Sequence, residues 1–216
     1  MQQYAQQETI DNKLFVPLGT FFVNDNPDFR ELEHLISATG LPRRDLRNLE
    51  HYRGFVLEAY VKWTFGRFAE MVGCPVSPSQ FTSGVLGNGR MYDTDNWGNV
   101  VFYNPRTKKT VAEVDGMYEY REDGTIVPVI LEISFVENPS MNLGRKDDSV
   151  KMLYPTPRHY LRIRPAVRGE NLGLHRRTDI YKRFKRSPER RKNYREIVIP
   201  KREEFSQLAE MLIAKT

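Results

Sequence analysis

Two acidic residues, Asp115 and Glu132, stand in neighbouring segments that the sequence predicts to be the two strands of one hairpin. The dipeptide Asp123-Gly124 between them is typical of a two-residue turn, in which residues equally distant from the turn pair with each other. Asp115 then lies directly opposite Glu132, with both carboxylates on one face of the hairpin. Facing carboxylates repel each other unless a cation lies between them, and oxygen ligands suit Mg²⁺ or Mn²⁺. The spacing therefore predicts a divalent-metal site.

The same spacing has less specific explanations. The face could be solvated and the pair incidental, or a slip of one residue could send the two carboxylates to opposite faces. The apolar run Val129–Phe135 favours a buried strand, however, and a buried Glu132 needs a partner. In the expected register Glu113 also lies opposite Ser134, which places a third carboxylate at the border of the site.

Val111–Gly116 and Val129–Ser134 together resemble the core of the restriction-endonuclease-like, or PD-(D/E)XK, nuclease superfamily. In that superfamily an Asp on one strand and a Glu-x-Lys on the next hold Mg²⁺ for phosphodiester hydrolysis. The resemblance implies that Asp115 and Glu132 are metal ligands, and that the backbone carbonyl of Ile133 is a further ligand.

A third motif lies on a predicted helix upstream of the hairpin. Arg53-Gly54, followed by three residues and Glu58, resembles the helical motif of the superfamily and implies that Glu58 completes the site. The resemblance covers about Tyr52–Arg164. It implies an α/β fold with a mixed sheet flanked by helices, and a Mg²⁺- or Mn²⁺-dependent DNA endonuclease. The small size and basic C-terminal region look most like archaeal or viral Holliday-junction resolvases, which implies branched DNA, a homodimer and a cytoplasmic location, the host cytoplasm if the chain is viral.

The lysine of the superfamily motif is replaced here by Ser134. A serine can hydrogen-bond a water molecule but carries no positive charge for the transition state. The basic residues Arg145, Lys146 and Lys151, which follow the second strand, are candidates to supply that charge. We therefore expect Ser134 and Lys146 in the catalytic set. A non-cleaving, DNA-binding relative remains the alternative.

The charge distribution points to a polyanionic partner. The chain has 216 residues and a net charge of +5, with 33 Lys and Arg against 28 Asp and Glu. Thirteen basic and four acidic residues fall within 168–202, which leaves the rest of the chain slightly acidic. Phosphate contacts require such a density of cations, although a solvated arm without a partner would have the same composition. The residues expected to contact DNA are Arg176, Arg177, Lys182, Arg183, Lys185, Arg186, Arg190, Arg191 and Lys192.

Patterns along the chain predict the elements that must position these residues. Asn26 and Pro27 are typical of a helix start, which predicts a helix over 28–39, and a longer amphipathic pattern runs over 42–72. That second helix could kink or be two helices, and its first half could pair with another subunit or pack on its own domain. The segment 14–23 could be a strand or a packed arm. A short helix is expected within 139–153, and strands are expected at 81–86, 100–103, 110–120, 126–136 and 159–164.

These elements suggest three parts: an N-terminal arm and helix (1–41), a nuclease-like core (42–167) and a basic C-terminal extension (168–216). No 18-residue apolar run and no signal-peptide pattern occur, and Cys74 is the single cysteine, so we expect an intracellular protein without a membrane partner. The sequence has no P-loop, no dinucleotide-type GxGxxG and no Gly-x-Ser-x-Gly motif, so no motif in it supports nucleotide hydrolysis or esterase chemistry.

Overall fold

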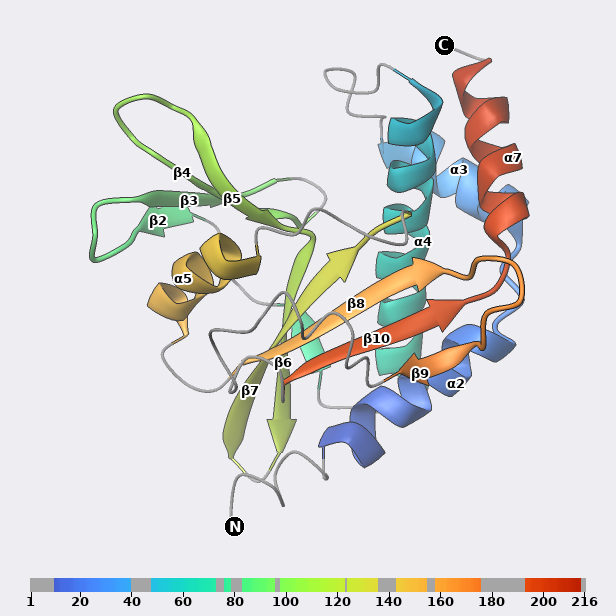
Figure 1. Cartoon of the computed structure of the whole chain (residues 1–216), viewed down its shortest axis with the longest axis horizontal. Helices are drawn as coiled ribbons and strands as arrows, with labels where there is room; N and C mark the ends of the chain where they lie inside the picture. Colours follow the sequence, from blue (N-terminus) through green and yellow to red (C-terminus); the bar gives the residue numbers. More distant parts are fainter. Residues whose placement is uncertain are drawn as a thin grey trace.

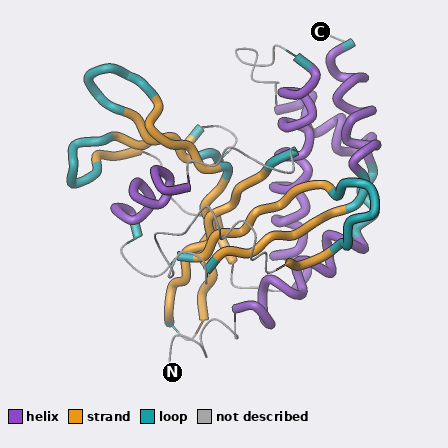
Figure 2. Tube along the Cα trace, in the orientation of Figure 1, coloured by secondary structure: helices purple, strands orange, loops and turns teal. Residues whose placement is uncertain are grey.

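The structure is a computed structural model that describes residues 10–39, 48–72, 76–78, 83–95, 98–122, 124–135, 143–154, 158–175 and 193–214. The described strands form two separate sheets, one of six strands and one of four (Figure 1). Helices flank the larger sheet, and loops join the elements at its ends (Figure 2). The mixed α/β class expected from the sequence is confirmed, and the second sheet is an addition that the sequence did not reveal.

The six-stranded sheet is mixed and has the order β1-β6-β7-β8-β10-β9. The central strands β7, β8 and β10 are parallel to one another, whereas β1, β6 and β9 pair antiparallel to their neighbours. Helix α5 lies between β7 and β8 in the chain, as a crossover between parallel strands requires. The bounds are β1 Val76–Pro78, β6 Gly116–Glu122, β7 Thr125–Ile133, α5 Leu143–Leu153, β8 His159–Pro165, β9 Gly173–His175 and β10 Tyr194–Ile199.

Helices from both ends of the chain cover one face of this sheet. Their apolar side chains share one core with Leu131, Leu161 and Ile197 from three neighbouring strands. The apolar face of the long helix α4 is buried within this core, so its pattern is explained by packing on its own domain. The helical elements on this side are the π-helical turn η1 Asp11–Phe15, α2 Val16–Asn24, α3 Phe29–Thr39, α4 Leu49–Val72 and α7 Arg202–Ile213.

Two sequence predictions in this region need adjustment. The segment 14–23 is helical, in η1 and α2, and is neither a strand nor an irregular arm. The helix predicted over 28–39 is confirmed as α3, but Asn26 is not its cap. The Asp28 carboxylate accepts a hydrogen bond from the Arg30 N–H at 2.8 Å, which satisfies a backbone donor at the start of the helix.

The four-stranded sheet has the order β2-β3-β4-β5 and is antiparallel throughout. Its last strand ends at Val114, and β6 of the larger sheet begins at Gly116. The single strand predicted over 110–120 is therefore wrong: the chain changes sheets at Asp115. The bounds are β2 Ser83–Val85, β3 Met91–Thr94, β4 Val100–Tyr103 and β5 Thr110–Val114.

A second apolar core joins the small sheet, α5 and the other face of the large sheet. Phe102 and Val114 from the small sheet pack with Val150 of α5 and with Ile130 and Tyr160 of the large sheet. Side chains alternate along a strand, so the residues of β7 on this face are Ile130 and its second neighbour Glu132. Glu132 therefore points to the α5 face of the large sheet.

The C-terminal region differs from the predicted basic extension. β10 is an interior strand between β8 and β9, and α7 joins the same core as the N-terminal helices. Arg195, counted with the basic residues of this region, is 4% exposed and donates two hydrogen bonds to the Asp11 carboxylate, at 2.8 and 2.7 Å. The described parts of all three predicted segments thus share one structure. Among the described residues, no helix is long and apolar enough to cross a membrane.

Candidate functional site

The predicted register of the hairpin is confirmed. Gly116 pairs with Leu131 and Glu122 with Thr125, which is the register expected from the sequence. Asp115 directly precedes β6, and its carboxylate accepts a hydrogen bond from the Ile133 N–H at 2.5 Å. This bond holds Asp115 beside the end of β7, next to Glu132. The structure thus brings together the two acids on which the sequence argument depends.

The pKa values of both carboxyl groups are raised above their ordinary values. Burial and the neighbouring Glu132 carboxylate raise the pKa of Asp115 from 3.8 to about 8, although the Ile133 N–H opposes this shift. Burial likewise raises the pKa of Glu132, which is 6% exposed. Two buried acids this close cannot both ionise without compensating positive charge. A cation at this position would supply that compensation.

The first source of positive charge is Lys146, on α5. Its Nζ donates to both oxygens of Glu132, at 2.8 and 2.7 Å. The superfamily resemblance would put a lysine at position 134, two residues after Glu132, and here an ammonium reaches the same carboxylate from the crossover helix. Ser134 itself directly follows β7, and its N–H continues the pairing with the carbonyl of Ile163. Among the three predicted candidates, Lys151 is exposed, and the side chain of Arg145 lies outside the described residues.

Glu58 lies on α4, the helix that the sequence predicted. Its charge is one of those that raise the pKa of the Asp115 carboxyl. The ammonium of Lys62, one turn further along α4, donates to Glu58 Oε1 at 2.6 Å and to Asn99 Oδ1 at 2.6 Å. Asn99 in turn donates to both carboxylate oxygens of Asp95, at 2.9 and 3.0 Å. Lys62 therefore links the helix to the turn between β3 and β4, a contact that the sequence did not predict.

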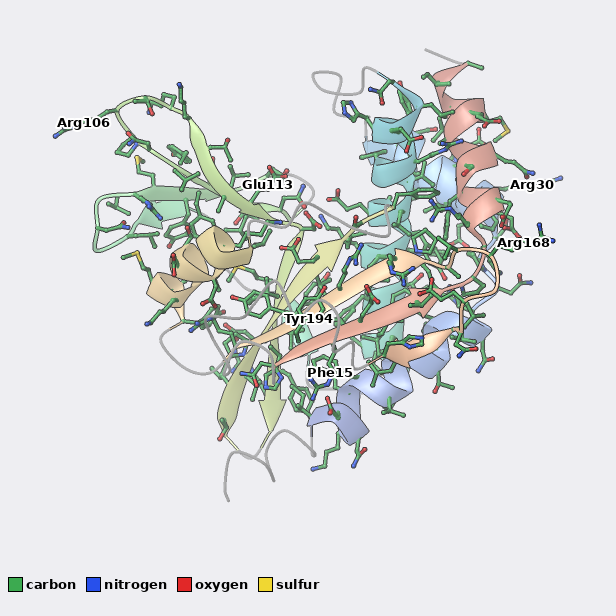
Figure 3. All side chains as sticks on the ribbon, in the orientation of Figure 1. Phe15, Arg30, Arg106, Glu113, Arg168 and Tyr194 are labelled. Carbon is green, nitrogen blue, oxygen red and sulfur yellow. The ribbon has the colours of Figure 1, made fainter. Side chains whose placement is uncertain are left out.

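The position of Glu113 differs from the prediction. Glu113 belongs to β5 and pairs with Val101, so it does not oppose Ser134. The physical reason is the change of sheet at Asp115, which ends the hairpin register there. Glu113 nevertheless borders the site: partial burial, followed by the charges of Glu58 and Asp95, raises its pKa. Figure 3 shows it near the base of the hairpin formed by β4 and β5.

Beside the carboxylate pair, the same face of the large sheet carries a buried ionic network. Arg162 lies between Glu132 and Glu196 in the register of three neighbouring strands. Arg162 Nη1 and Arg164 Nε donate to Glu196 Oε1 at 2.8 and 3.1 Å, and all three side chains are fully buried. The alternation of arginine with apolar residues in β8 could have signalled this network. It places a guanidinium next to the site, where its charge lowers the pKa of Glu132.

A buried carboxylate anchors the helix that carries Lys146. Asp147, 3% exposed, accepts hydrogen bonds from Arg158 Nε at 3.1 Å and Nη2 at 2.8 Å, and a short one from the hydroxyl of Tyr160. Because Tyr160 belongs to β8, this cluster fixes α5 against the sheet. The orientation of Lys146 towards Glu132 follows from that attachment.

We expect Asp147→Ala to lower the free energy of unfolding by about 3 kcal/mol, because it leaves the partly buried guanidinium of Arg158 and the buried hydroxyl of Tyr160 without this acceptor. Asp148→Ala, at the exposed neighbouring position, is the matched control and should change it by less than about 0.5 kcal/mol. Chemical denaturation measures both. Equal effects of the two substitutions would mean that Asp147 does not anchor the helix.

The raised pKa of Asp115 also predicts how the stability of the metal-free protein depends on pH. Between about pH 4 and 8 the folded state holds a proton that the unfolded state has lost, so the stabilisation is present at low pH and is lost as the pH rises through about 8. Asp115→Asn should make the free energy of unfolding fall less steeply with pH, by up to about 1.4 kcal/mol per pH unit. Denaturation in EDTA from pH 5 to 8 checks the expectation, and parallel curves for the two proteins would contradict it.

The donor set suits a hard divalent cation. Asp115, Glu132 and Glu58 offer carboxylate oxygens, and burial raises the pKa values of the first two, so a cation beside them would favour their ionised forms. Within the described ranges, however, no three acidic, histidine or cysteine side chains form a ready-made metal site. The ammoniums of Lys62 and Lys146 lie on two of the three carboxylates, so metal binding would require these ion pairs to open or to share their acceptors.

Other predicted residues bear less on the site. His159 is buried against Phe15, and burial followed by the charge of Arg195 lowers its pKa to about 4, so it is a neutral structural residue. The nine basic residues expected to contact DNA, from Arg176 to Lys192, lie outside the described residues. Comparisons with protein-family models, curated proteins and solved structures found no match. Any functional conclusion therefore depends on the chemistry of the carboxylate pair and its lysines.

Proposed function

We propose that this chain is a Mg²⁺- or Mn²⁺-dependent endonuclease that hydrolyses phosphodiester bonds in DNA, with a restriction-endonuclease-like core. The observation that carries the proposal is the buried pair Asp115 and Glu132 with the Lys146 ammonium on it. Two acids and one lysine on adjoining elements suit metal-assisted phosphoryl chemistry, because the lysine can compensate charge that develops on the phosphate. The mixed sheet with a crossover helix is compatible with such a core.

Each residue has a distinct role in this proposal. Asp115 and Glu132 would hold the cation, with Glu58 and the Ile133 carbonyl as further ligands. A bound divalent cation would lower the pKa of a water molecule and shield the phosphate. Lys146 would neutralise the transition-state charge that the motif lysine carries in the superfamily. Ser134 would hydrogen-bond the attacking water.

Cleavage assays test the proposal directly. Supercoiled plasmid, single-stranded DNA and four-way junctions are incubated with Mg²⁺, with Mn²⁺ and with EDTA. Divalent-dependent cleavage of any of these by the wild type, lost in Asp115→Asn, supports the proposal. No cleavage of any substrate with either metal would contradict it.

The second candidate is a non-cleaving DNA-binding protein with a nuclease-like fold. It is favoured by Ser134 in place of the motif lysine and by the lysine partners of Glu58 and Glu132, which neutralise these acids without a metal. Calorimetric titration with Mn²⁺ separates the two candidates. A nuclease should bind the metal through Asp115 and Glu132, whereas in the second candidate DNA binding would persist without metal affinity or cleavage.

Branched DNA as substrate, a homodimer and a cytoplasmic location belong to the same proposal, since a dimer would place two sites against two strands. Light scattering coupled to size-exclusion chromatography measures the oligomeric state. Preferential cleavage of junctions over linear duplex measures the substrate preference.

The basic segment 176–192 supports DNA as the partner by its composition. Neutralising Lys182, Arg183 and Lys185 should weaken DNA affinity and make the slope of log K against log salt less negative by up to about 2.7, since each duplex phosphate contact contributes about 0.9. Turnover at saturating DNA should persist, because the proposed metal ligands lie elsewhere in the chain. Fluorescence anisotropy over a salt series measures the slope. An unchanged slope would mean that these three residues are solvated and do not contact phosphates.

A further inference from the structure

The tip of the hairpin formed by β4 and β5 is an exposed cluster of positive charge. Arg106, Lys108 and Lys109 are all exposed, and residues 98–112 contain no Asp or Glu. Among the described residues, none of these three side chains forms an ion pair with a carboxylate. Figure 3 shows Arg106 pointing away from the body of the molecule at the far end of this hairpin. We call these three residues the hairpin tip.

The backbone of the hairpin tip is held in one shape by Asn104. The Asn104 side chain accepts hydrogen bonds from the N–H groups of Arg106 and Thr107, at 2.9 and 3.2 Å. Its backbone N–H donates to the Lys109 carbonyl at 3.0 Å, and its carbonyl accepts from the Lys108 N–H at 2.8 Å. The charges are therefore presented on an ordered turn, which lowers the entropic cost of binding a ligand there.

The hairpin tip is connected to the carboxylates along one face of the small sheet. The Lys108 ammonium lies 5.8 Å from the centre of the Tyr103 ring. Tyr103 and Val101 lie on the same face of β4, and Val101 pairs with Glu113 of β5. The opposite face of this sheet is buried against α5. The more accessible face thus runs from a basic end to the acidic residues of the site.

The spacing along β5 suits the repeat of a nucleic-acid backbone. Asp115 is six positions after Lys109, which is about 20 Å of extended chain. Phosphates of one duplex strand are about 3.4 Å apart along the helix axis, so this length corresponds to about six nucleotides. The site itself is rich in carboxylates, and a polyanion needs cations nearby to approach it.

We propose that the hairpin tip binds the phosphate backbone of duplex DNA about six nucleotides from the bond at the Asp115–Glu132 site. This inference rests on the proposed function and adds a second DNA contact, separate from the basic segment 176–192. The tip contacts phosphates and no bases, so it positions the duplex without selecting its sequence. Arg106, Lys108 and Lys109 are binding residues and take no part in the chemical step.

A charge-matched pair of variants tests the contact. Arg106→Gln/Lys109→Gln removes two charges from the hairpin tip and leaves Lys108 in place. Lys108 has a positive φ of 55°, so a substitution there could also change the backbone of the turn. Arg30→Gln/Arg168→Gln removes two exposed charges that lie on the opposite side of the view in Figure 3. The tip variant should bind a 30-base-pair duplex about tenfold more weakly at 0.15 M salt, and its salt slope should be less negative by about 1.8. The control should bind like the wild type.

Anisotropy is measured without divalent metal, so the result does not depend on cleavage. Equal slopes for the tip variant, the control and the wild type would overturn the inference and leave the proposed nuclease intact. Absence of DNA binding by the wild type would overturn both. For cleavage, KM should rise in the tip variant while kcat stays within about twofold, because the reacting groups are unchanged.

A photo-crosslinker measures the predicted spacing. p-Benzoylphenylalanine at Thr107, an exposed residue of the turn, should crosslink to DNA about six nucleotides from the cleavage position when an end-labelled duplex is used. The same group at Arg30 should give little crosslinking. Equal crosslinking from the two positions, or crosslinks spread evenly along the duplex, would overturn the proposed contact.

Discussion

Asp115→Asn is expected to abolish divalent-dependent DNA cleavage, by about 10³-fold or more, while the protein stays folded. The loss follows because an amide is a poor ligand for Mg²⁺, and the metal contributes several kcal/mol of transition-state stabilisation. The fold should persist because the amide oxygen can still accept the hydrogen bond from the Ile133 N–H. Removal of one of two facing buried acids should even raise the stability of the metal-free protein at pH 8. Plasmid cleavage and chemical denaturation in EDTA measure the two effects.

Glu132→Gln is a less clean test of the same pair, because it also removes the partner of the Lys146 ammonium. A loss of activity in Glu132→Gln would reflect both weaker metal binding and a displaced Lys146 ammonium. Asp148→Asn serves as the control for both variants, since Asp148 is exposed on α5 and bears on no step of the proposed chemistry. Wild-type cleavage by Asp115→Asn would exclude Asp115 as a ligand, and a matching loss in Asp148→Asn would indicate a nonspecific effect of charge.

Lys146→Ala is expected to lower kcat by about 10²-fold with little change in KM for DNA, which is the usual scale for the loss of one charge-stabilising group. The structure singles out this lysine because its ammonium is bonded to both oxygens of Glu132. Lys151→Ala, on the exposed side of the same helix, should keep wild-type turnover and is the matched control. Single-turnover cleavage at saturating DNA measures the chemical step for both.

Metal affinity separates a catalytic Lys146 from one that only neutralises Glu132. Removing the ammonium leaves Glu132 without its resident cation, so the metal no longer competes with an ion pair, and Lys146→Ala should bind Mn²⁺ more tightly than the wild type even as turnover falls. Lys146→Arg keeps the charge and should retain part of the activity. Tighter metal binding together with wild-type turnover in Lys146→Ala would assign the lysine a purely structural role. The role of the motif lysine in the chemical step would then fall to Ser134.

The local features of the site were predictable from the sequence because they depend on short-range geometry. The Asp123-Gly124 turn determines which residues pair across the hairpin, and the alternation of side chains along strands follows from backbone geometry, so the proximity of Asp115 and Glu132 could be inferred. The helix that carries Glu58 has an apolar pattern that predicts its existence, but its buried residues lie around most of its circumference because it packs between the sheet and other helices. Each of these inferences uses residues that are near each other in the chain or joined by one turn.

The tertiary structure alone decided the rest. The change of sheet at Asp115 moves Glu113 away from Ser134. The dipeptide Asp115-Gly116 is a local break signal, but it does not indicate that the chain passes into a second sheet there. Lys146 could be named only as one of three candidates, since the rotation of α5 depends on the contacts of Asp147 with Arg158 and Tyr160. The burial of Arg195 against Asp11 joins residues from the two ends of the chain. Composition and spacing determine which elements form and which side chains share a face, whereas contacts between distant segments determine which charges meet, because packing and ion pairing act through space and not along the chain.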